Sequence, residues 1–477
     1  MPSNDELLAL DAFLDASAQR PMLGLMYGRR RIGKSTLLVQ TVRHRGGFYY
    51  EAARVDTGMQ LRRLGASLGS YLDVGPLALE GWEDAIDRLL GLADTTPFPV
   101  VLDEFGYMLE ADPSVASLIA GALGPVHGRT GAARLVLCGS AITLMRSLTA
   151  GQAPLRGRAG MELLMWPDDY RRAASRLAVT SDLDLAGRVF SVIGGVVGYA
   201  TDMVAHDLPE DADDFGRWVA QRVLSPAATL HHEATTLLAE DPTLAAGSRV
   251  HHHSILAAIG GGSGTAGAIA KRVGRPVPNL APALNRLVDT GFVARHEDPI
   301  RGRRPTYGLI DPFLQFNYAV LEPHRSLLRA HGADALWSDR LVHVFDSQVR
   351  GPVFEQQARA FVQRYADAAT LGGPADHVGP SEIVADGVAH EVDVVVATGD
   401  DVAASRTVLA IGEAKVGQTV DAAELRRLER LRAALGTRGA HARLLLFAAR
   451  FTNELRQAAR ARSDLELVDH DRLYHGT

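Results

Sequence analysis

Cysteine is nearly absent from this chain of 477 residues, which contains only Cys138. A single cysteine excludes a disulfide within the chain and a cysteine cluster that would bind zinc. Cys138 ends the apolar run 135–138, so we interpret it as a small core residue of a buried strand.

Long apolar runs are absent as well. The longest uncharged stretches, 189–201 and 254–270, are rich in glycine and too short to span a bilayer comfortably. Residues 1–15 carry acidic side chains where a signal peptide has a basic start and an apolar core. We therefore expect a cytoplasmic protein without a membrane partner.

The sequence also lacks a strong excess of charge. Its net charge is −6, with 47% hydrophobic and 22% charged residues, close to the averages of globular proteins. The chain is too long for one core, so roughly two to four domains are expected. Because the whole molecule is slightly acidic, any contact with nucleic acid must come from a local basic patch.

The first part of the chain alternates short apolar runs with helical patterns, as α/β sheets with crossover helices do. Residues 168–248 show helical patterns without strand runs. From 249 to 312, three short helical patterns precede two strand-like runs, which is typical of a winged helix. The strands expected in the first part lie at 22–27, 48–51, 98–103, 135–139 and 161–165.

The first expected strand runs directly into residues 28–35 (GRRRIGKS), which match G-x-x-x-x-G-K-[ST] at every fixed position. A helix is expected to open at Thr36. In such a loop the backbone amides surround the phosphates, Lys34 neutralises β- and γ-phosphate oxygens, and the Ser35 hydroxyl ligates Mg²⁺. We therefore predict ATP and Mg²⁺ as ligands. The residues expected to contact them are Gly28, Arg29, Arg30, Arg31, Ile32, Gly33, Lys34, Ser35 and Thr36.

The expected strand 98–103 ends in two carboxylates. Asp103 would hold Mg²⁺ together with Ser35, and Glu104 would activate the attacking water as general base. In P-loop ATPases with a catalytic glutamate, the strand at 135–139 lies between the loop strand and the acidic strand. Ser140 would then face the γ-phosphate, with a helix N-cap for 141–145 as the alternative role.

A guanidinium follows at Arg158, which would reach the γ-phosphate or else be a surface arginine. These motifs together resemble the archaeal-type ATPases of the STAND group of P-loop proteins. The segments that carry the resemblance are 27–31 (YGRRR), 102–105 (LDEF), 138–140 (CGS) and 154–158 (PLRGR). The resemblance favours Arg158 as a phosphate sensor, although Arg156 stands where the family has tyrosine.

The resemblance extends through 307–316, which is similar to the segment after the winged helix in these proteins, to a restriction-endonuclease-like C-terminal domain. The chain departs from the family pattern in two places. The family's Arg-Glu near the N-terminus is missing, which leaves adenine recognition open. The segment 194–199 (GGVVGY) lacks the proline of the family's turn in the helical lid.

The predicted fold class is thus α/β, with a parallel P-loop sheet and further modules. The predicted domains are a P-loop ATPase core at 1–167, a helical lid at 168–248, a winged helix at 249–312, a helical linker at 313–345 and a restriction-endonuclease-like domain at 346–477.

A local basic patch lies in the expected winged helix. Residues 271–304 contain eight basic and three acidic side chains, which favours contact with a phosphate backbone. The helix 278–290 would enter a groove and 301–304 would form the wing, so double-stranded DNA is the predicted partner. A winged helix that acts as a spacer or contacts protein is the alternative.

The C-terminal part carries acids in two expected strands, 389–397 and 407–415. Glu413 and Lys415 share a face because alternate residues of a strand point the same way, and Asp393 can face them. With Glu355 on the expected helix 353–365, they match the D…E-x-K arrangement of restriction-like nucleases, in which carboxylates hold Mg²⁺ and the lysine positions or activates water. Metal-dependent DNA cleavage is the prediction, and DNA binding without cleavage is the alternative.

The predicted function is an ATP-hydrolysing switch that sets the position of the lid and the winged helix, with a homo-oligomer left open. The alternatives are a DNA-binding regulator that binds ATP without hydrolysing it, and a nuclease gated by ATP.

Overall fold

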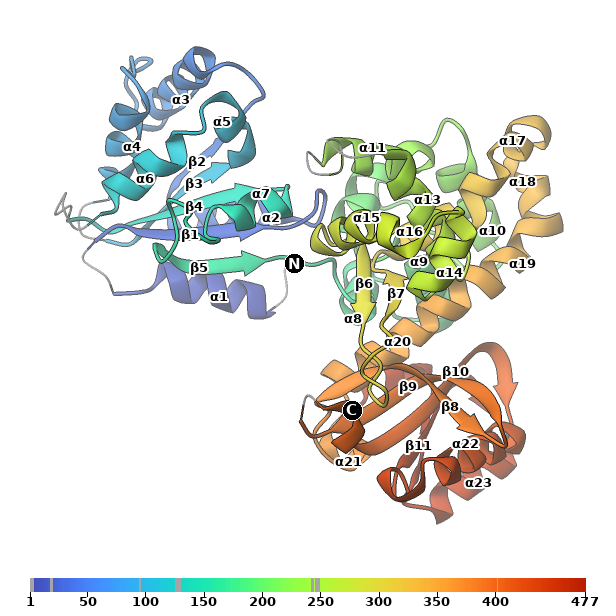
Figure 1. Ribbon diagram of the computed structural model, residues 1–477. Helices are drawn as coiled ribbons and strands as arrows, with labels where there is room; N and C mark the ends of the chain where they lie inside the picture. Colours follow the sequence, from blue (N-terminus) through green and yellow to red (C-terminus); the bar gives the residue numbers. More distant parts are fainter. Residues whose placement is uncertain are drawn as a thin grey trace.

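The computed structural model describes residues 4–17, 20–93, 96–124, 130–241, 244, 249–400 and 402–477. These residues form three bodies in Figure 1. The N-terminal body (4–165) is drawn in blue and teal, the helical body (166–350) in green to light orange, and the C-terminal body (351–477) in orange and red. Among the residues that the structure describes, no helix combines the length and apolar character needed to cross a membrane.

The N-terminal body is built on a parallel sheet of five strands in the order β2-β3-β4-β1-β5. The first three expected strands are confirmed, the other two begin two residues earlier than expected, and β4 lies between β1 and β3 as predicted. The strands are β1 (Met22–Tyr27), β2 (Phe48–Glu51), β3 (Phe98–Asp103), β4 (Ala133–Gly139) and β5 (Ala159–Leu164).

Helices cover both faces of this sheet, which explains why its strands are short apolar runs. Leu25 and Leu137 face the core shared with α3, α4 and α6, whereas Met26 and Val136 face the core shared with α1, α2 and the helical body. The helices are α1 (Asn4–Leu14), α2 (Lys34–Arg45), α3 (Thr57–Tyr71), α4 (Trp82–Leu90), α5 (Phe105–Ala111), α6 (Val115–Ala122) and α7 (Ile142–Ser147).

The helical body continues the core of the second face, so it is packed onto the N-terminal body rather than tethered to it. π-type turns over Asn317–Leu321, Trp337–Leu341 and Asp346–Arg350 link its last helices to one another and to the C-terminal body. Its helices are α8 (Tyr170–Arg176), α9 (Leu183–Ile193), α10 (Phe215–Val219), α11 (Leu230–Glu240), α13 (Arg249–Gly260), α14 (Ala266–Val273), α15 (Val277–Asp289), α16 (Pro312–Phe316), α17 (Glu322–His331), α18 (Ala333–Leu336) and α19 (Val342–Phe345).

Helices α13 to α15 and the antiparallel hairpin of β6 (Val293–His296) and β7 (Thr306–Leu309) form a helix–hairpin module. The hairpin extends from the helical body toward the C-terminal body in Figure 1. Leu280, Leu284 and Leu287 recur at helical spacing and are buried, which fixes the inner face of α15.

The C-terminal body has a mixed sheet in the order β12-β11-β10-β9-β8, in which β8, β9 and β10 are antiparallel and β10, β11 and β12 parallel. Sequence reasoning missed β8, an edge strand that contains Pro380, a residue tolerated at sheet edges. The elements are α20 (Gly351–Arg364), α21 (Ala368–Leu371), β8 (His377–Ala385), β9 (Val388–Thr398), β10 (Thr407–Val420), α22 (Ala422–Ala434), β11 (Arg443–Phe451), α23 (Asn453–Ala461), β12 (Leu465–Val468) and α24 (His470–His475).

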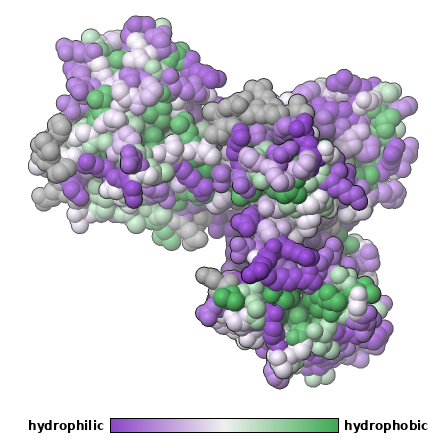
Figure 2. All heavy atoms as spheres, in the orientation of Figure 1, coloured by the Kyte–Doolittle hydropathy of each residue, from purple (hydrophilic) through white to green (hydrophobic). Residues whose placement is uncertain are grey.

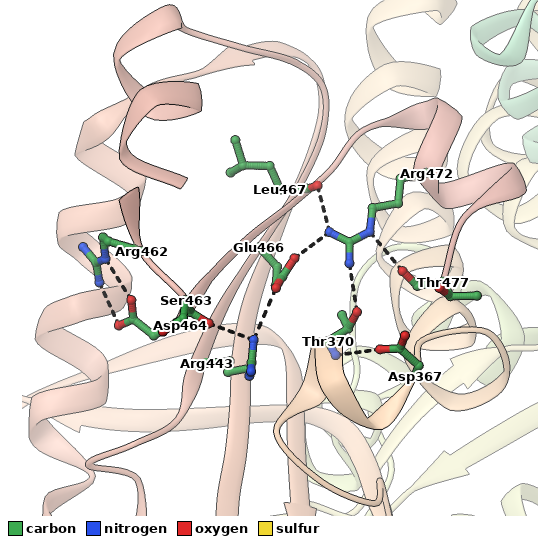
Figure 3. A network of polar contacts seen from close by, with 10 residues as sticks. All are labelled: Asp367, Thr370, Arg443, Arg462, Ser463, Asp464, Glu466, Leu467, Arg472 and Thr477. Carbon is green, nitrogen blue, oxygen red and sulfur yellow. Dashed lines mark hydrogen bonds and ion pairs between the residues drawn. The ribbon is translucent and has the colours of Figure 1, made fainter. Parts of the chain in front are cut away.

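Arg472 on α24 is the centre of the polar network in Figure 3. Its guanidinium donates to Glu466 of β12 at 2.7 Å and to Thr370 of α21 at 2.9 Å. On α8, Arg171 donates to the carbonyls of Leu473 and Gly476, each at 2.8 Å. The last helix therefore ties the C-terminal body to the helical body.

The surface differs between the bodies on the face seen in Figure 2. Hydrophilic residues gather where the hairpin meets the C-terminal body, and hydrophobic residues gather beside them on the C-terminal body. Val384, Val388 and Val402 are among its exposed apolar side chains.

Candidate nucleotide site

The loop after β1 has the backbone of a phosphate-binding loop. At Gly28 a Cβ would lie 2.4 Å from the Ile32 side chain and 2.5 Å from the Met165 carbonyl, so only glycine fits. Gly33 has a φ of 98°, in the left-handed region that favours glycine, and α2 begins at Lys34, earlier than expected. The loop thus leads into a helix N-terminus, which attracts anions.

The Lys34 side chain folds back into the loop and bonds to its backbone. Its Nζ donates to the carbonyl oxygens of Gly28 at 2.8 Å and Arg29 at 2.9 Å. Burial lowers the pKa of Lys34, while the nearby carboxylates of Glu104 and Asp103 oppose this shift. The ammonium group is therefore held between the loop and the acidic end of β3.

Asp103 ends β3 with a fully engaged carboxylate. Tyr49 of β2 donates to its Oδ2 at 2.7 Å, and the amide of Glu104 donates to its Oδ1 at 2.8 Å. Burial raises the pKa of Asp103, but hydrogen bonds from Cys138, Ser35 and Tyr49 outweigh it and hold the pKa below its usual value. Ser35 and Asp103 are thus brought together as predicted, and their oxygens are ligands of the kind that Mg²⁺ prefers, so this pair fits the ion.

Glu104 and Ser140 are also adjacent. Ser140 Oγ donates to Glu104 Oε2 at 3.1 Å. Glu104 has a φ of 49°, an uncommon conformation for a residue with a side chain and one that clusters at functional sites. The alternative role of Ser140 as a helix N-cap is wrong, because α7 has Ala141 at its N-cap and no side-chain cap.

Glu104 and Ser140 border a cavity of about 510 Å³ between the N-terminal body and α11. Arg30 lies on the same cavity, and its Nη2 donates to the Tyr107 hydroxyl at 2.6 Å. Helix α11 therefore covers the side of the loop on which the acidic residues lie.

Arg158 lies at the opposite edge of the sheet. The next residue, Ala159, pairs with Leu23 near the start of β1, and Arg158 Nη1 donates to the Leu123 carbonyl at 3.3 Å. Because β1 and β5 are parallel, about five residues at roughly 3.3 Å each separate this edge from the loop, or about 16 Å. The expectation that Arg158 reaches a γ-phosphate bound to its own chain is wrong.

The outer side chains of the loop contact the helical body, which the motif does not predict. Arg31 Nε donates to Glu233 of α11 at 2.9 Å, and its carbonyl accepts from the Gly198 amide at 2.8 Å. Arg29 Nη2 donates to Asp311 at 3.2 Å. No pattern in the sequence predicts that Glu233 and Asp311 contact the loop or that Tyr49 contacts Asp103, because the partners lie in separate segments.

The basic segment is only partly available to a partner. Arg301 pairs with Glu382 of β8 at 2.7 Å, so this part of the expected wing contacts the C-terminal body, in disagreement with its predicted role on DNA. Arg303 and Arg304 are exposed. The outer face of α15 carries one basic side chain, exposed Arg286, beside exposed Pro278, Pro282, Asn285 and Asp289.

The four C-terminal residues of the expected nuclease core are gathered around β9 and β10. The Ala414 amide donates to Asp393 Oδ2 at 2.9 Å, and Lys415 Nζ donates to Glu413 Oε1 at 2.6 Å. Arg427 of α22 donates to Glu413 Oε2 at 2.5 Å. Glu355 on α20 is 3.7 Å from Arg359 of the same helix.

Burial and the charges of Glu355 and Glu413 raise the pKa of Asp393 to about 7, and burial also raises the pKa of Glu355. Both carboxylate oxygens of Glu413 already accept from cations. Within the described parts of the chain, no group of three or more His, Cys, Asp or Glu is placed to hold a metal ion. In this structure Glu413 is therefore paired with Lys415 and Arg427 rather than open to a cation.

No family model matches the chain. An uncharacterized protein of Methanocaldococcus jannaschii, MJECL04, is 23% identical over 365 residues, which are 75% of this chain and 76% of that protein. The solved ORC2 protein of Aeropyrum pernix has a TM-score of 0.43 at 18% identity, over 68% of this chain and 92% of its own. The Walker-type ATPase PABY2304 of Pyrococcus abyssi has a TM-score of 0.50 at 20% identity, over 66% of this chain and 95% of its own. The likeness to this last protein shows the fold alone: the matched part of this chain folds as that Walker-type ATPase does.

Proposed function

We propose that the chain binds ATP with Mg²⁺ at the loop 28–35 and hydrolyses it. One observation carries the proposal: Lys34, Ser35, Asp103 and Glu104 come from two strand ends and lie together at the carboxyl edge of the sheet. The fold supports it, because parallel α/β sheets bind ligands at this edge.

The roles follow from the positions. Loop amides and the start of α2 receive the phosphates, and Lys34 exchanges its carbonyl partners for phosphate oxygens. Ser35 and Asp103 would hold Mg²⁺, which would neutralise charge on the phosphates. Glu104, oriented by Ser140, accepts the proton of the attacking water.

Two variants test this assignment. We expect Lys34→Ala to lose nucleotide binding and Glu104→Gln to retain binding but lose turnover by about 10²–10⁴-fold, the usual contribution of a general base. Binding is measured with a fluorescent nucleotide and turnover by phosphate release. Unchanged nucleotide affinity in Lys34→Ala would show that the site is elsewhere. Wild-type protein that binds ATP without turnover would favour the non-hydrolysing regulator.

We also propose that ATP binding and hydrolysis act as a switch that sets the position of the helical lid and the winged helix. Two contacts support the switch: Arg29 donates to Asp311 and Arg31 donates to Glu233. Both acids belong to the helical body, so this body contacts the outer side of the loop. We also propose membership of the STAND group and the domain division expected from the sequence, with boundaries near 168, 249, 313 and 346.

Contact with double-stranded DNA is a second proposal, with the helix–hairpin module as a winged helix. Exposed Lys271, Arg275, Arg286 and Arg295 support it. The test is a gel shift at low salt with and without ATP, in which an absence of binding under both conditions would remove the proposal.

Cleavage of that DNA would require Glu413 to release Arg427 before a cation could bind. Plasmid cleavage with Mg²⁺ or Mn²⁺, lost in Asp393→Ala, is the result expected of a nuclease. Intact plasmid, linear and single-stranded DNA under every metal condition would leave DNA binding as the role of this body.

Arg158 keeps a proposed role in hydrolysis only across a contact with a second copy of the chain. It is exposed at the edge of the sheet opposite the loop, so it can serve a neighbouring site but not its own.

A further inference from the structure

The side chain of Arg29 leaves the phosphate loop and is buried at the base of the β6–β7 hairpin. Its Nη2 lies 3.2 Å from Asp311 Oδ2, and the side chains are 6% and 0% exposed. Its guanidinium carbon lies 4.4 Å from the centre of the Phe292 ring. Among the described residues, its Nε and Nη1 have no hydrogen-bond partner. A loop residue is therefore held by the helix–hairpin module through one hydrogen bond and one ring.

Phe292 and Asp311 are the residues that flank the hairpin. Phe292 precedes β6, Asp311 follows β7 by two residues, and the Ile310 amide donates to the Phe292 carbonyl at 3.2 Å between them. Asp311 also accepts from the Tyr199 hydroxyl at 3.3 Å and from the Phe313 amide at 3.0 Å, which caps α16. Arg29 thus contacts the residues at both ends of the hairpin, Phe292 and Asp311.

The tip of the same hairpin is fixed to the C-terminal body. Ser381 of β8 donates to the buried carboxylate of Asp298 at 2.7 Å, and Arg301 pairs with Glu382 at 2.7 Å. Arg406 donates to the Pro299 carbonyl at 3.3 Å.

The residues of β8 that bind the tip are paired with β9. Ser381 and Glu382 pair with Val392 and Glu391 of β9, the strand that carries Asp393. The tip therefore contacts β8, which is the neighbour of β9, the strand that carries Asp393.

We infer that the β6–β7 hairpin is an internal lever, held at its base by Arg29 and at its tip by β8, that couples the phosphate loop to the C-terminal body. A loop that closes around phosphate moves the backbone of Arg29, and this movement reaches Phe292 and Asp311 directly. The hairpin then carries the change along two short strands to β8. In this role Arg29 is a positioning residue: its main chain belongs to the loop and its side chain to the hairpin.

The inference rests on the nucleotide binding proposed above. Its test has two arms, of which the first uses a nucleotide and the second does not. In the first arm, amide hydrogen exchange of the full chain is followed in β8 with and without Mg²⁺ and a non-hydrolysable ATP analogue. We expect the analogue to change exchange in β8 at least about threefold in the wild type. Asp311→Asn should bind the analogue with affinity within about threefold of wild type and lose the change in β8. Tyr199→Phe is the matched control, since it removes a different hydrogen bond to Asp311 and should keep the change.

In the second arm, exchange in the loop 28–35 is measured without nucleotide after Ser381→Ala and Glu382→Gln loosen the tip. Coupling is reciprocal, so the loosened tip should change exchange in the loop. The tip variants should change exchange in the loop when Asp311 is present, and they should not change it when they are combined with Asp311→Asn. A merely structural contact gives additive effects, whereas the lever gives a non-additive pair.

Three outcomes are decisive. A change in β8 that persists in Asp311→Asn overturns the lever, as does analogue binding to the wild type with no change in β8. Equal loop effects of the tip variants in both backgrounds also overturn it. Wild-type protein that does not bind the analogue overturns the proposed ATP site, and the nucleotide-free arm then decides the lever by itself.

Discussion

Replacing Arg29 with methionine would leave the carboxylate of Asp311 buried without its cation. Burial already raises the pKa of Asp311, and the Arg29 guanidinium opposes this rise. Without the guanidinium the pKa rises further, so the folded protein holds a proton that the unfolded chain, with a pKa of about 3.9, has released. The free energies of unfolding of wild type and Arg29→Met should therefore both fall as pH rises above about 4, but that of Arg29→Met should fall up to a higher folded pKa. Its deficit relative to wild type should grow by about 1.4 kcal/mol per pH unit between the two folded pKa values.

Replacing Asp311 with asparagine should give a different pH profile. It leaves a buried guanidinium that stays protonated at every accessible pH. Removing one partner of a buried ion pair costs about 3–5 kcal/mol, because the remaining charge is uncompensated. The Phe292 ring is present with and without Asp311 and does not offset this loss. The free energy of local unfolding of Asp311→Asn should therefore be low, and it should contain no contribution from this pair that varies with pH.

The assay is amide hydrogen exchange in α16, the helix that Asp311 caps. Exchange gives the free energy of local unfolding once its intrinsic pH dependence is removed, and it does not require the whole chain to unfold in two states. The double variant Arg29→Met/Asp311→Asn has no titrating group in the pair, so its own free energy of local unfolding should show no titration from it. A deficit of Arg29→Met that is constant with pH, or that grows as pH falls, would refute the buried ion pair.

Three further predictions concern the nucleotide site. Tyr49→Phe removes a hydrogen bond that stabilises ionised Asp103, so the Mg²⁺ concentration for half-maximal turnover should rise about fivefold, equivalent to about 1 kcal/mol; an unchanged Mg²⁺ titration would contradict this. Ser140→Ala frees Glu104 and should lower kcat about tenfold with KM within about twofold, measured by steady-state phosphate release; a loss confined to KM would place Ser140 on the bound substrate instead. Arg158→Ala should leave ATP affinity unchanged and lower turnover only at protein concentrations where copies associate; a loss at every concentration would contradict its position at the far edge of the sheet.

The phosphate loop could be predicted from the sequence because its chemistry is local. Residues 28–35 are consecutive, and their amides, Lys34 and Ser35 take their places once one strand and one helix flank them. The acids at the end of β3 were predictable for a related reason. Parallel strands bring their carboxyl ends to one edge, so Asp103 and Glu104 lie at the same edge as the loop, and they come near it because only β4 separates β3 from β1.

Arg158 shows where this reasoning fails. A spacing along the chain does not say at which edge of a sheet a residue emerges, and Arg158 precedes β5 rather than following it. Strand β8 was not predicted, because Gly379 and Pro380 interrupt its apolar pattern. A proline is tolerated there because β8 is an edge strand, which pairs with a neighbour on one side only.

By itself the sequence determined the loop, the acidic strand end and the alternation of strands and helices, because each depends on neighbours within a few residues. Only the tertiary structure decided that Tyr49 supports Asp103, that Arg29 is buried against Asp311, and that the hairpin tip contacts β8. These contacts join segments tens to hundreds of residues apart, and their energies depend on burial that exists only when the bodies are packed together.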